Sequence, residues 1–141
     1  THSGYAVAAF HEALRILLTH GRGKKAADYA FYESILKEAV EAMGCEVTSN
    51  MTSLVVLNLP GEFAGREKEL VQNCRAEGFG IWPTLSEPVQ IRIGILNQLN
   101  QAALCDIVSR FCAAMSHLGV AVNKSSIMGQ IDKRFSQRNC T

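Results

Sequence analysis

The chain has 141 residues, the length of one ordinary domain, which is enough to bury a core without a disulfide or a metal. Its formal charge is +1, from 14 basic and 13 acidic residues spread along the sequence, so composition gives no signal for a nucleic-acid or anionic-membrane partner. No apolar run approaches the roughly 20 residues needed to span a bilayer, and no basic region precedes the first apolar residues, as it would in a signal peptide. We therefore expect a protein that binds neither nucleic acid nor membrane, and the odd number of cysteines without a pairing motif predicts reduced thiols and a cytoplasmic location.

The five cysteines are an odd number, and the sequence has no C-x-x-C motif. This pattern disfavours both a disulfide framework and a zinc site. The four histidines never stand at metal-ligand spacing with a cysteine or carboxylate, so we expect no metal site. The sequence begins without a methionine, and we expect it to be a fragment or a processed product of a longer chain.

The first two predicted helices cover residues 3–21 and 24–43, where apolar side chains recur every three or four positions. Glycines follow both segments and would end the helices. Because only the sequence HGRG joins them, we expect the two helices to lie side by side. The repeated apolar positions are Val7, Phe10, Leu14, Leu17 and Leu18 in the first helix and Tyr29, Leu36, Val40 and Met43 in the second.

After residue 44 the three- to four-residue spacing of apolar side chains ends. Short segments rich in β-branched residues and bounded by turn residues follow, and they predict strands. The predicted elements are strands at 45–49 and 53–60, a helix at 64–78, strands at 79–83 and 89–96, and a helix at 100–118. The order α-α-β-β-α-β-β-α predicts an α+β, two-layer small domain, with a mainly antiparallel sheet of about four strands and helices packed on one face. We assign this domain to residues 1–123, and residues 124–141 to a polar tail that contains at most a short helix.

The strand VQIRIGIL alternates, so that its isoleucines point to one face and Arg92 to the other. Gly94 lies two residues further along the same face and leaves open space beside the arginine. Two interpretations follow from this pattern. Arg92 is either an ordinary residue on the solvated face of a sheet or an anion site, because a guanidinium can bind a carboxylate through two hydrogen bonds.

Other side chains give weaker signals for chemistry. Lys124 could form a Schiff base if it were desolvated, but its polar surroundings favour a solvated lysine. Trp82, the single tryptophan, could line a pocket, although core packing is the more common role of a tryptophan. The sequence contains no G-x-S-x-G motif and no P-loop. We identify no catalytic residue within the chain.

The stretch GFGIWPTLSEPVQIRIGIL resembles the C-terminal, small domain of class V, fold type I pyridoxal-phosphate aminotransferases, the group of the alanine-glyoxylate, serine-glyoxylate and 2-aminoethylphosphonate transaminases. The resemblance covers most of the chain. It includes an opening threonine, a helix with HEAL, a strand before LP, a helix that ends in AEGF, the R-I-G strand and a last amphipathic helix.

The resemblance implies a role for two residues. In the family the arginine of R-I-G binds the substrate carboxylate, and Arg92 holds that position; the threonine before the first helix contacts the cofactor phosphate, and Thr1 is its counterpart. The implied cofactor is pyridoxal 5'-phosphate, the implied ligands are small amino and 2-oxo acids, and the implied full-length assembly is a homodimer. No lysine of the chain matches the family's Schiff-base context, so we expect no transamination without the absent large domain.

A different class of protein is also compatible with this sequence. A non-catalytic α+β module could use the same sheet and helices to bind an effector or a partner, because a fold does not determine a function. A lysine-bearing large domain encoded immediately upstream would favour the transaminase, and a gene that begins near Thr1 would favour the module. If the large domain is missing, we also expect exposed apolar surface where it would contact this one.

Overall fold

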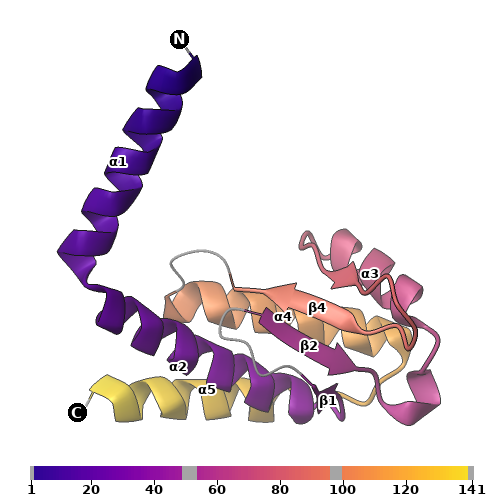
Figure 1. Ribbon diagram of the computed structural model, residues 1–141. Helices are drawn as coiled ribbons and strands as arrows, with labels where there is room; N and C mark the ends of the chain where they lie inside the picture. Colours follow the sequence, from indigo (N-terminus) through magenta and orange to yellow (C-terminus); the bar gives the residue numbers. More distant parts are fainter. Residues whose placement is uncertain (1, 49–53, 96–99, 140–141) are drawn as a thin grey trace.

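The computed structural model describes residues 2–48, 54–95 and 100–139. Its helices and strands follow the predicted order, with one further helix at the C-terminal end (Figure 1). The elements are α1 (His2–His20), α2 (Arg22–Glu41), β1 (Glu46–Val47), β2 (Leu54–Asn58), the 3-10 turn η1 (Gly61–Phe63), α3 (Glu67–Ala76), β3 (Trp82–Pro83), β4 (Ile91–Gly94), α4 (Gln101–Leu118) and α5 (Lys124–Asn139). The predicted α+β class is confirmed.

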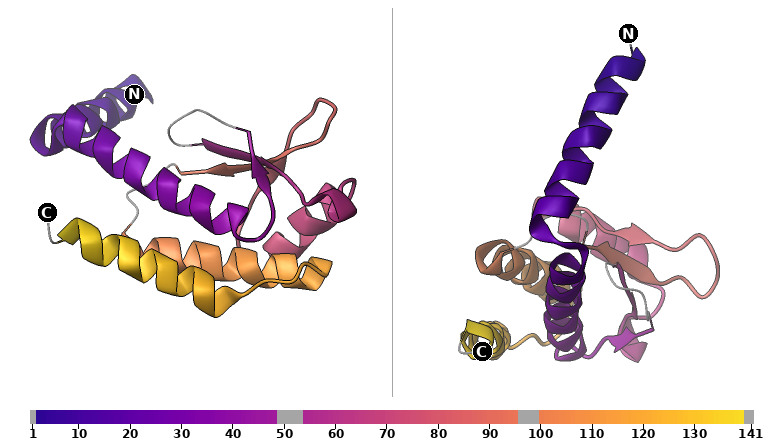
Figure 2. Two further views of the ribbon diagram at one scale, coloured as in Figure 1. Left: turned by 90° about the horizontal axis from the view of Figure 1, so that it is seen from below. Right: turned by 60° about the vertical axis from the view of Figure 1, so that its left-hand side comes forward.

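The four strands form one antiparallel sheet in the order β1-β2-β4-β3. Strand β2 pairs with β4 at the centre, with Leu57 opposite Ile91 and Val55 opposite Ile93. These four side chains are at most 3% exposed, because successive residues of a strand point to opposite faces and this face lies against the helices. Helices α2, α4 and α5 lie on one side of the sheet (Figure 2), and no described helix packs against its other face, which is called the open face.

The hydrophobic core lies between the sheet and helices α2 and α4. Leu36 and Val40 of α2 and Leu104 and Phe111 of α4 are at most 1% exposed, as their helical spacing predicts. Helix α4 begins at a side-chain cap, where Asn100 Oδ1 accepts a hydrogen bond from the Ala103 main-chain N–H at 2.8 Å. The core thus gives the sheet a rigid backing.

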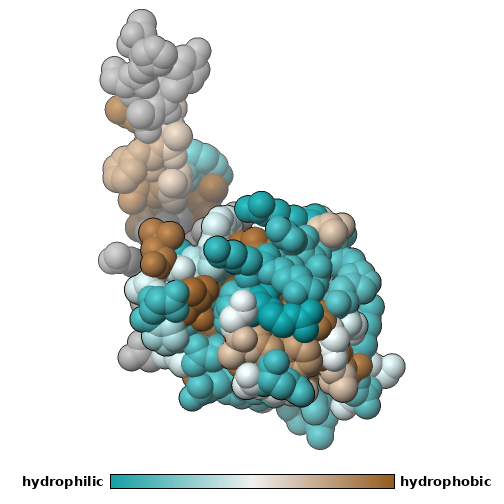
Figure 3. Space-filling view, turned by 90° about the vertical axis from the view of Figure 1, so that its right-hand side faces the viewer, coloured by the Kyte–Doolittle hydropathy of each residue, from teal (hydrophilic) through white to brown (hydrophobic). Residues whose placement is uncertain are grey.

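Helix α1 does not lie beside α2, and that expectation is wrong. Only Gly21 separates the two helices, and its positive φ of 72° turns the chain without reversing it, so α1 projects from the body (Figure 1). Val7, Phe10 and Leu18 are 66%, 66% and 77% exposed. Figure 3 shows hydrophobic surface on this projecting helix beside a more hydrophilic body. The chain therefore exposes apolar surface, as expected, and it is concentrated on α1.

Helix α5 is longer than the short helix expected in a polar tail. Ile127, Ile131 and Phe135 recur every four residues and are 2%, 2% and 7% exposed, so one face of α5 belongs to the same core as the sheet and α4. Its neighbours include α2, and Phe135 meets the ring of Phe31 edge-on, with 5.2 Å between centroids. The polar composition of the segment reflects only its outer face.

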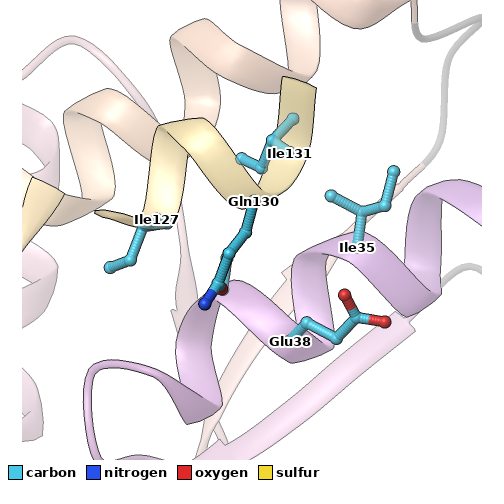
Figure 4. Close-up of a pocket in the computed structure, with 6 residues that line it drawn as sticks. Ile35, Glu38, Ile127, Gln130 and Ile131 are labelled. Atoms are coloured by element: carbon cyan, nitrogen blue, oxygen red, sulfur yellow. The ribbon is translucent and has the colours of Figure 1, made fainter. Parts of the chain in front are cut away.

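A narrow crevice separates α2 from α5 (Figure 4). Ile35, Ile127 and Ile131 line it, and the crevice leaves no room for a water molecule. Glu38, also in its lining, is paired with Arg134 of α5, with Nη1 and Oε1 3.1 Å apart. The crevice is therefore a packing seam between two helices and not a binding cavity.

Candidate anion-binding site

Arg92 lies on β4, on the face of the sheet that the helices leave open. Its neighbours Ile91 and Ile93 are 0% and 3% exposed and point into the core, so alternation places the arginine on the opposite face. In the strand register it stands between Val56 of β2 and Trp82 of β3. Two central strands backed by the core hold its main chain, so the arginine extends from a rigid position.

Only some of the hydrogen-bond donors of the Arg92 guanidinium have an acceptor among the described residues. Its Nη2 donates a hydrogen bond to the main-chain carbonyl oxygen of Pro83, 3.1 Å away. Its Nε is buried and has no hydrogen-bond partner among the described residues. A buried N–H of a charged group without an acceptor costs free energy, and such groups are uncommon in folded proteins. The arginine is therefore anchored on one side and has donor capacity to spare.

Trp82 is 56% exposed, so the expectation of core packing is wrong for this residue. It lies at the edge of the sheet directly opposite Arg92, and directly opposite side chains of an antiparallel pair share a face. Its ring leans toward Gly80, where an added Cβ would lie 4.0 Å from the indole Cζ2. The indole thus forms an apolar wall beside the arginine on the open face.

A network of polar side chains begins at Gln90, two residues before Arg92 along the chain. Gln90 Nε2 donates hydrogen bonds to Thr48 Oγ1 and to Asn58 Oδ1, both at 3.0 Å. Asn58 in turn donates to a carboxylate oxygen of Glu46 on the edge strand β1, at 2.9 Å. This network ties three strands together, and it gives the open face an apolar side at Trp82 and a polar side at Gln90.

Beyond Asn58, a hollow of about 480 Å³ lies between the start of α3 and the β3–β4 loop. Its lining includes the buried Glu67, whose Oε1 accepts a hydrogen bond from the Gly65 main-chain N–H at 3.0 Å, and the exposed Lys68. The carboxylate of Glu67 thus holds the turn before α3, which is a structural role.

The other residues considered from the sequence lie apart from this face. Thr1 falls outside the described residues. Lys124 begins α5 and is exposed, as its polar surroundings indicated. In the described part of the chain, no group of three or more histidine, cysteine or acidic side chains could hold a metal ion. No helix among these described residues is long and apolar enough to cross a membrane.

The described cysteines Cys45, Cys74, Cys105 and Cys112 are free thiols. Burial raises the pKa of Cys45 and of Cys74 to about 12. It also raises the pKa of Cys105 and Cys112. Because a nucleophilic cysteine reacts as its thiolate, these thiols are suited to packing and not to covalent chemistry.

The sequence matches no family model and no curated protein. A solved structure, ureidoglycine-glyoxylate aminotransferase from Bacillus subtilis, matches 89% of this chain with a TM-score of 0.74 and 16% sequence identity. The chain shares its fold with part of that enzyme. The match covers 34% of the enzyme's chain, so this chain spans about a third of its length. The resemblance inferred from the R-I-G strand and the element order is confirmed at the level of the fold.

The cofactor implied by the resemblance, pyridoxal phosphate, requires a lysine for its Schiff base. The lysines whose side chains are described are all on helices, namely Lys37 on α2, Lys68 on α3, and Lys124 and Lys133 on α5. Lys37 is paired with the buried Glu33, with Nζ and Oε1 2.6 Å apart. None of these lysines is on the sheet that carries Arg92. The described residues therefore do not by themselves fit pyridoxal phosphate, because they place no lysine on this sheet for a Schiff base.

Proposed function

We propose that this chain is the small domain of a pyridoxal-phosphate-dependent aminotransferase, and that Arg92 binds the carboxylate of an amino or 2-oxo acid. The observation that carries the proposal is the guanidinium on the open face of an aminotransferase fold, with an unpartnered Nε and a single anchor at Pro83. A planar fork of donors held on a rigid strand can orient a small acid, and orientation is a large part of what an enzyme supplies.

In this proposal the chain supplies recognition, and the rest of the enzyme supplies the chemistry. The Schiff-base lysine and most cofactor contacts would lie outside these residues, with Thr1 as one contact to the cofactor phosphate. The chain alone would bind acids and would not transaminate. The full-length enzyme would be a cytoplasmic homodimer, and its substrates would be small amino and 2-oxo acids.

The binding step can be tested on this chain alone. The chain has a single tryptophan, so its indole N–H gives one resonance in a proton–nitrogen NMR spectrum, and the side-chain N–H of Arg92 can be assigned by mutation. We expect millimolar pyruvate to shift both resonances in the wild-type chain and to leave the indole resonance of Arg92→Met unchanged. Arg92→Lys should bind more weakly, because an ammonium lacks the planar fork. If pyruvate shifts neither resonance in the wild type, Arg92 is not a carboxylate site.

In this proposal the chemical step requires a longer protein that joins this chain to a large domain. We expect that protein to bind pyridoxal phosphate, to absorb visible light as a cofactor–lysine adduct, and to transaminate. Arg92→Ala in that protein should lower kcat/KM by about 30- to 5,000-fold, since truncating one partner of a desolvated charge pair costs about 2–5 kcal/mol. An unchanged kcat/KM for acid substrates would contradict the assigned role.

The second candidate is a ligand-binding module without chemistry. The described lysines are absent from the face that carries Arg92, which is what both candidates expect, because the transaminase would take its Schiff-base lysine from outside these residues. The two candidates make the same prediction for pyruvate binding and different predictions for the cofactor. A longer protein that binds pyruvate but takes up no pyridoxal phosphate would be a module.

A further inference from the structure

The open face of the sheet contains an exposed tryptophan that the proposed carboxylate site does not explain. Trp82 stands directly opposite Arg92 in the β3–β4 pair and is 56% exposed. An aromatic side chain this large on a solvated sheet face leaves apolar area in water, and exposed aromatic surface beside polar groups is typical of binding sites. Its position next to the Arg92 guanidinium, whose Nε has no partner among the described residues, suggests a shared ligand.

The indole is not occupied by the arginine. The cation–π contacts within the described residues involve Phe31, Tyr32 and Phe63, and none joins Arg92 to Trp82. A guanidinium often stacks on a neighbouring aromatic ring, but here Arg92 is instead held by the Pro83 carbonyl. The ring face therefore remains available to a molecule bound at the guanidinium.

The surroundings of the indole keep that space open. Gly80 has no side chain, and among the described residues the only heavy atom within 4 Å of a Cβ built there belongs to the indole itself, Cζ2 at 4.0 Å. Gly94, two residues after Arg92 on β4, adds no side chain to the same face. On the opposite side of Arg92, β2 presents the aliphatic side chain of Val56. Among the described residues of the sheet, an apolar, flat group attached to the bound carboxylate thus finds an aromatic face only on the tryptophan side.

We propose that Trp82 is the second recognition residue of the Arg92 site, and that its ring face contacts a planar group conjugated to the carboxylate of the ligand. The ligand class is the planar acids, of which the 2-oxo acids are the natural example, in preference to tetrahedral acids of equal charge and size. This inference rests on the proposed carboxylate role of Arg92. It adds that recognition depends on ligand shape as well as charge.

The test uses benzoate and cyclohexanecarboxylate, which have the same charge and ring size but differ in planarity. Their dissociation constants for the wild-type chain are measured from NMR chemical shifts. We expect benzoate to bind about 2- to 10-fold more tightly, the range that one aromatic contact contributes. Trp82→Ala should reduce that ratio to about one, and Trp82→Phe should retain part of it.

Leu85→Ala is the matched control, because Leu85 is a fully exposed apolar residue of the same β3–β4 hairpin, at 102% exposure. It should leave the benzoate preference unchanged, and circular dichroism should confirm that each variant is folded. If both acids bind equally to the wild type and Arg92→Met abolishes their binding, the role of Trp82 is refuted while the anion site stands. If neither acid binds the wild type, both proposals fail.

Discussion

Arg92 and Pro83 are joined across the β3–β4 pair, where Nη2 of the arginine donates a hydrogen bond to the main-chain carbonyl oxygen of the proline at 3.1 Å. The same arginine leaves Nε buried without a partner within the described chain. The two facts have opposite effects on stability, because the bond stabilises the sheet and the unpartnered N–H destabilises it. Arg92 is thus a poor residue for stability at its position.

The first prediction is that Arg92→Met leaves the free energy of unfolding within about 1 kcal/mol of the wild type, since each opposing effect is worth about 1–3 kcal/mol. Urea denaturation measures this. Ile91→Ala is the control on the adjacent, fully buried position of β4 and should cost about 2–5 kcal/mol. A loss above about 2 kcal/mol in Arg92→Met would mean that the arginine is retained for structure.

The second prediction compares the same substitution in the two N-terminal helices. Leu36 of α2 is 1% exposed, and Leu36→Ala should destabilise the chain by about 2–5 kcal/mol. Leu18 of α1 is 77% exposed, and Leu18→Ala should change stability by no more than about 0.5 kcal/mol. Denaturant midpoints distinguish the two variants. Equal losses would show that α1 is packed against other parts of the protein in solution.

The third prediction concerns α5. Phe135 is 7% exposed and meets Phe31 of α2 edge-on, so Phe135→Ala should cost about 3–5 kcal/mol. Lys133→Ala, an exposed position on the same helix, is the control and should be nearly neutral. A chain that ends at Asn123 should lose cooperative thermal unfolding. A truncated chain that unfolds as sharply as the full chain would identify α5 as an accessory helix.

The fourth prediction is a loss of stability at alkaline pH. Burial raises the pKa of Cys45 and of Cys74 to about 12, whereas an unfolded thiol has a pKa near 8.5. Between pH 9 and 12 the unfolded state therefore binds fewer protons than the folded state, and stability falls as pH rises. Denaturation at several pH values should show this fall, and a Cys45→Ala, Cys74→Ala chain should show a shallower one. Identical slopes for the two chains would contradict the burial of these thiols.

The sequence was informative where a single periodicity determined the structure. Alternation in β4 predicted correctly that Arg92 and the isoleucines lie on opposite faces, and helical spacing predicted the buried Leu104 and Phe111 of α4. It was uninformative where a position depends on contacts between distant segments. The apolar stripe of α1 predicted packing, yet Gly21 directs that helix away from the core.

Trp82 shows which part of the site could have been predicted. The segment from residue 82 to residue 92 reads as a strand, a turn and a strand, and pairing the two strands would have placed Trp82 beside Arg92. The hydrogen bonds from Gln90 to Thr48 and Asn58 could not have been predicted, because they depend on how β1 and β2 align with β4. Local spacing predicts which face of a strand a residue lies on, whereas the register between separate strands can be known only from the folded structure.

The central strand pair also has a consequence for the order of folding. Leu54 of β2 pairs with Gly94 of β4, and the intervening chain includes all of α3 and β3. Closing so long a loop costs entropy before the pairing stabilises it, so contacts of this kind form slowly compared with helices and hairpins. The β3–β4 hairpin can bring Arg92 and Trp82 together early, but their rigid backing by the core depends on this late step.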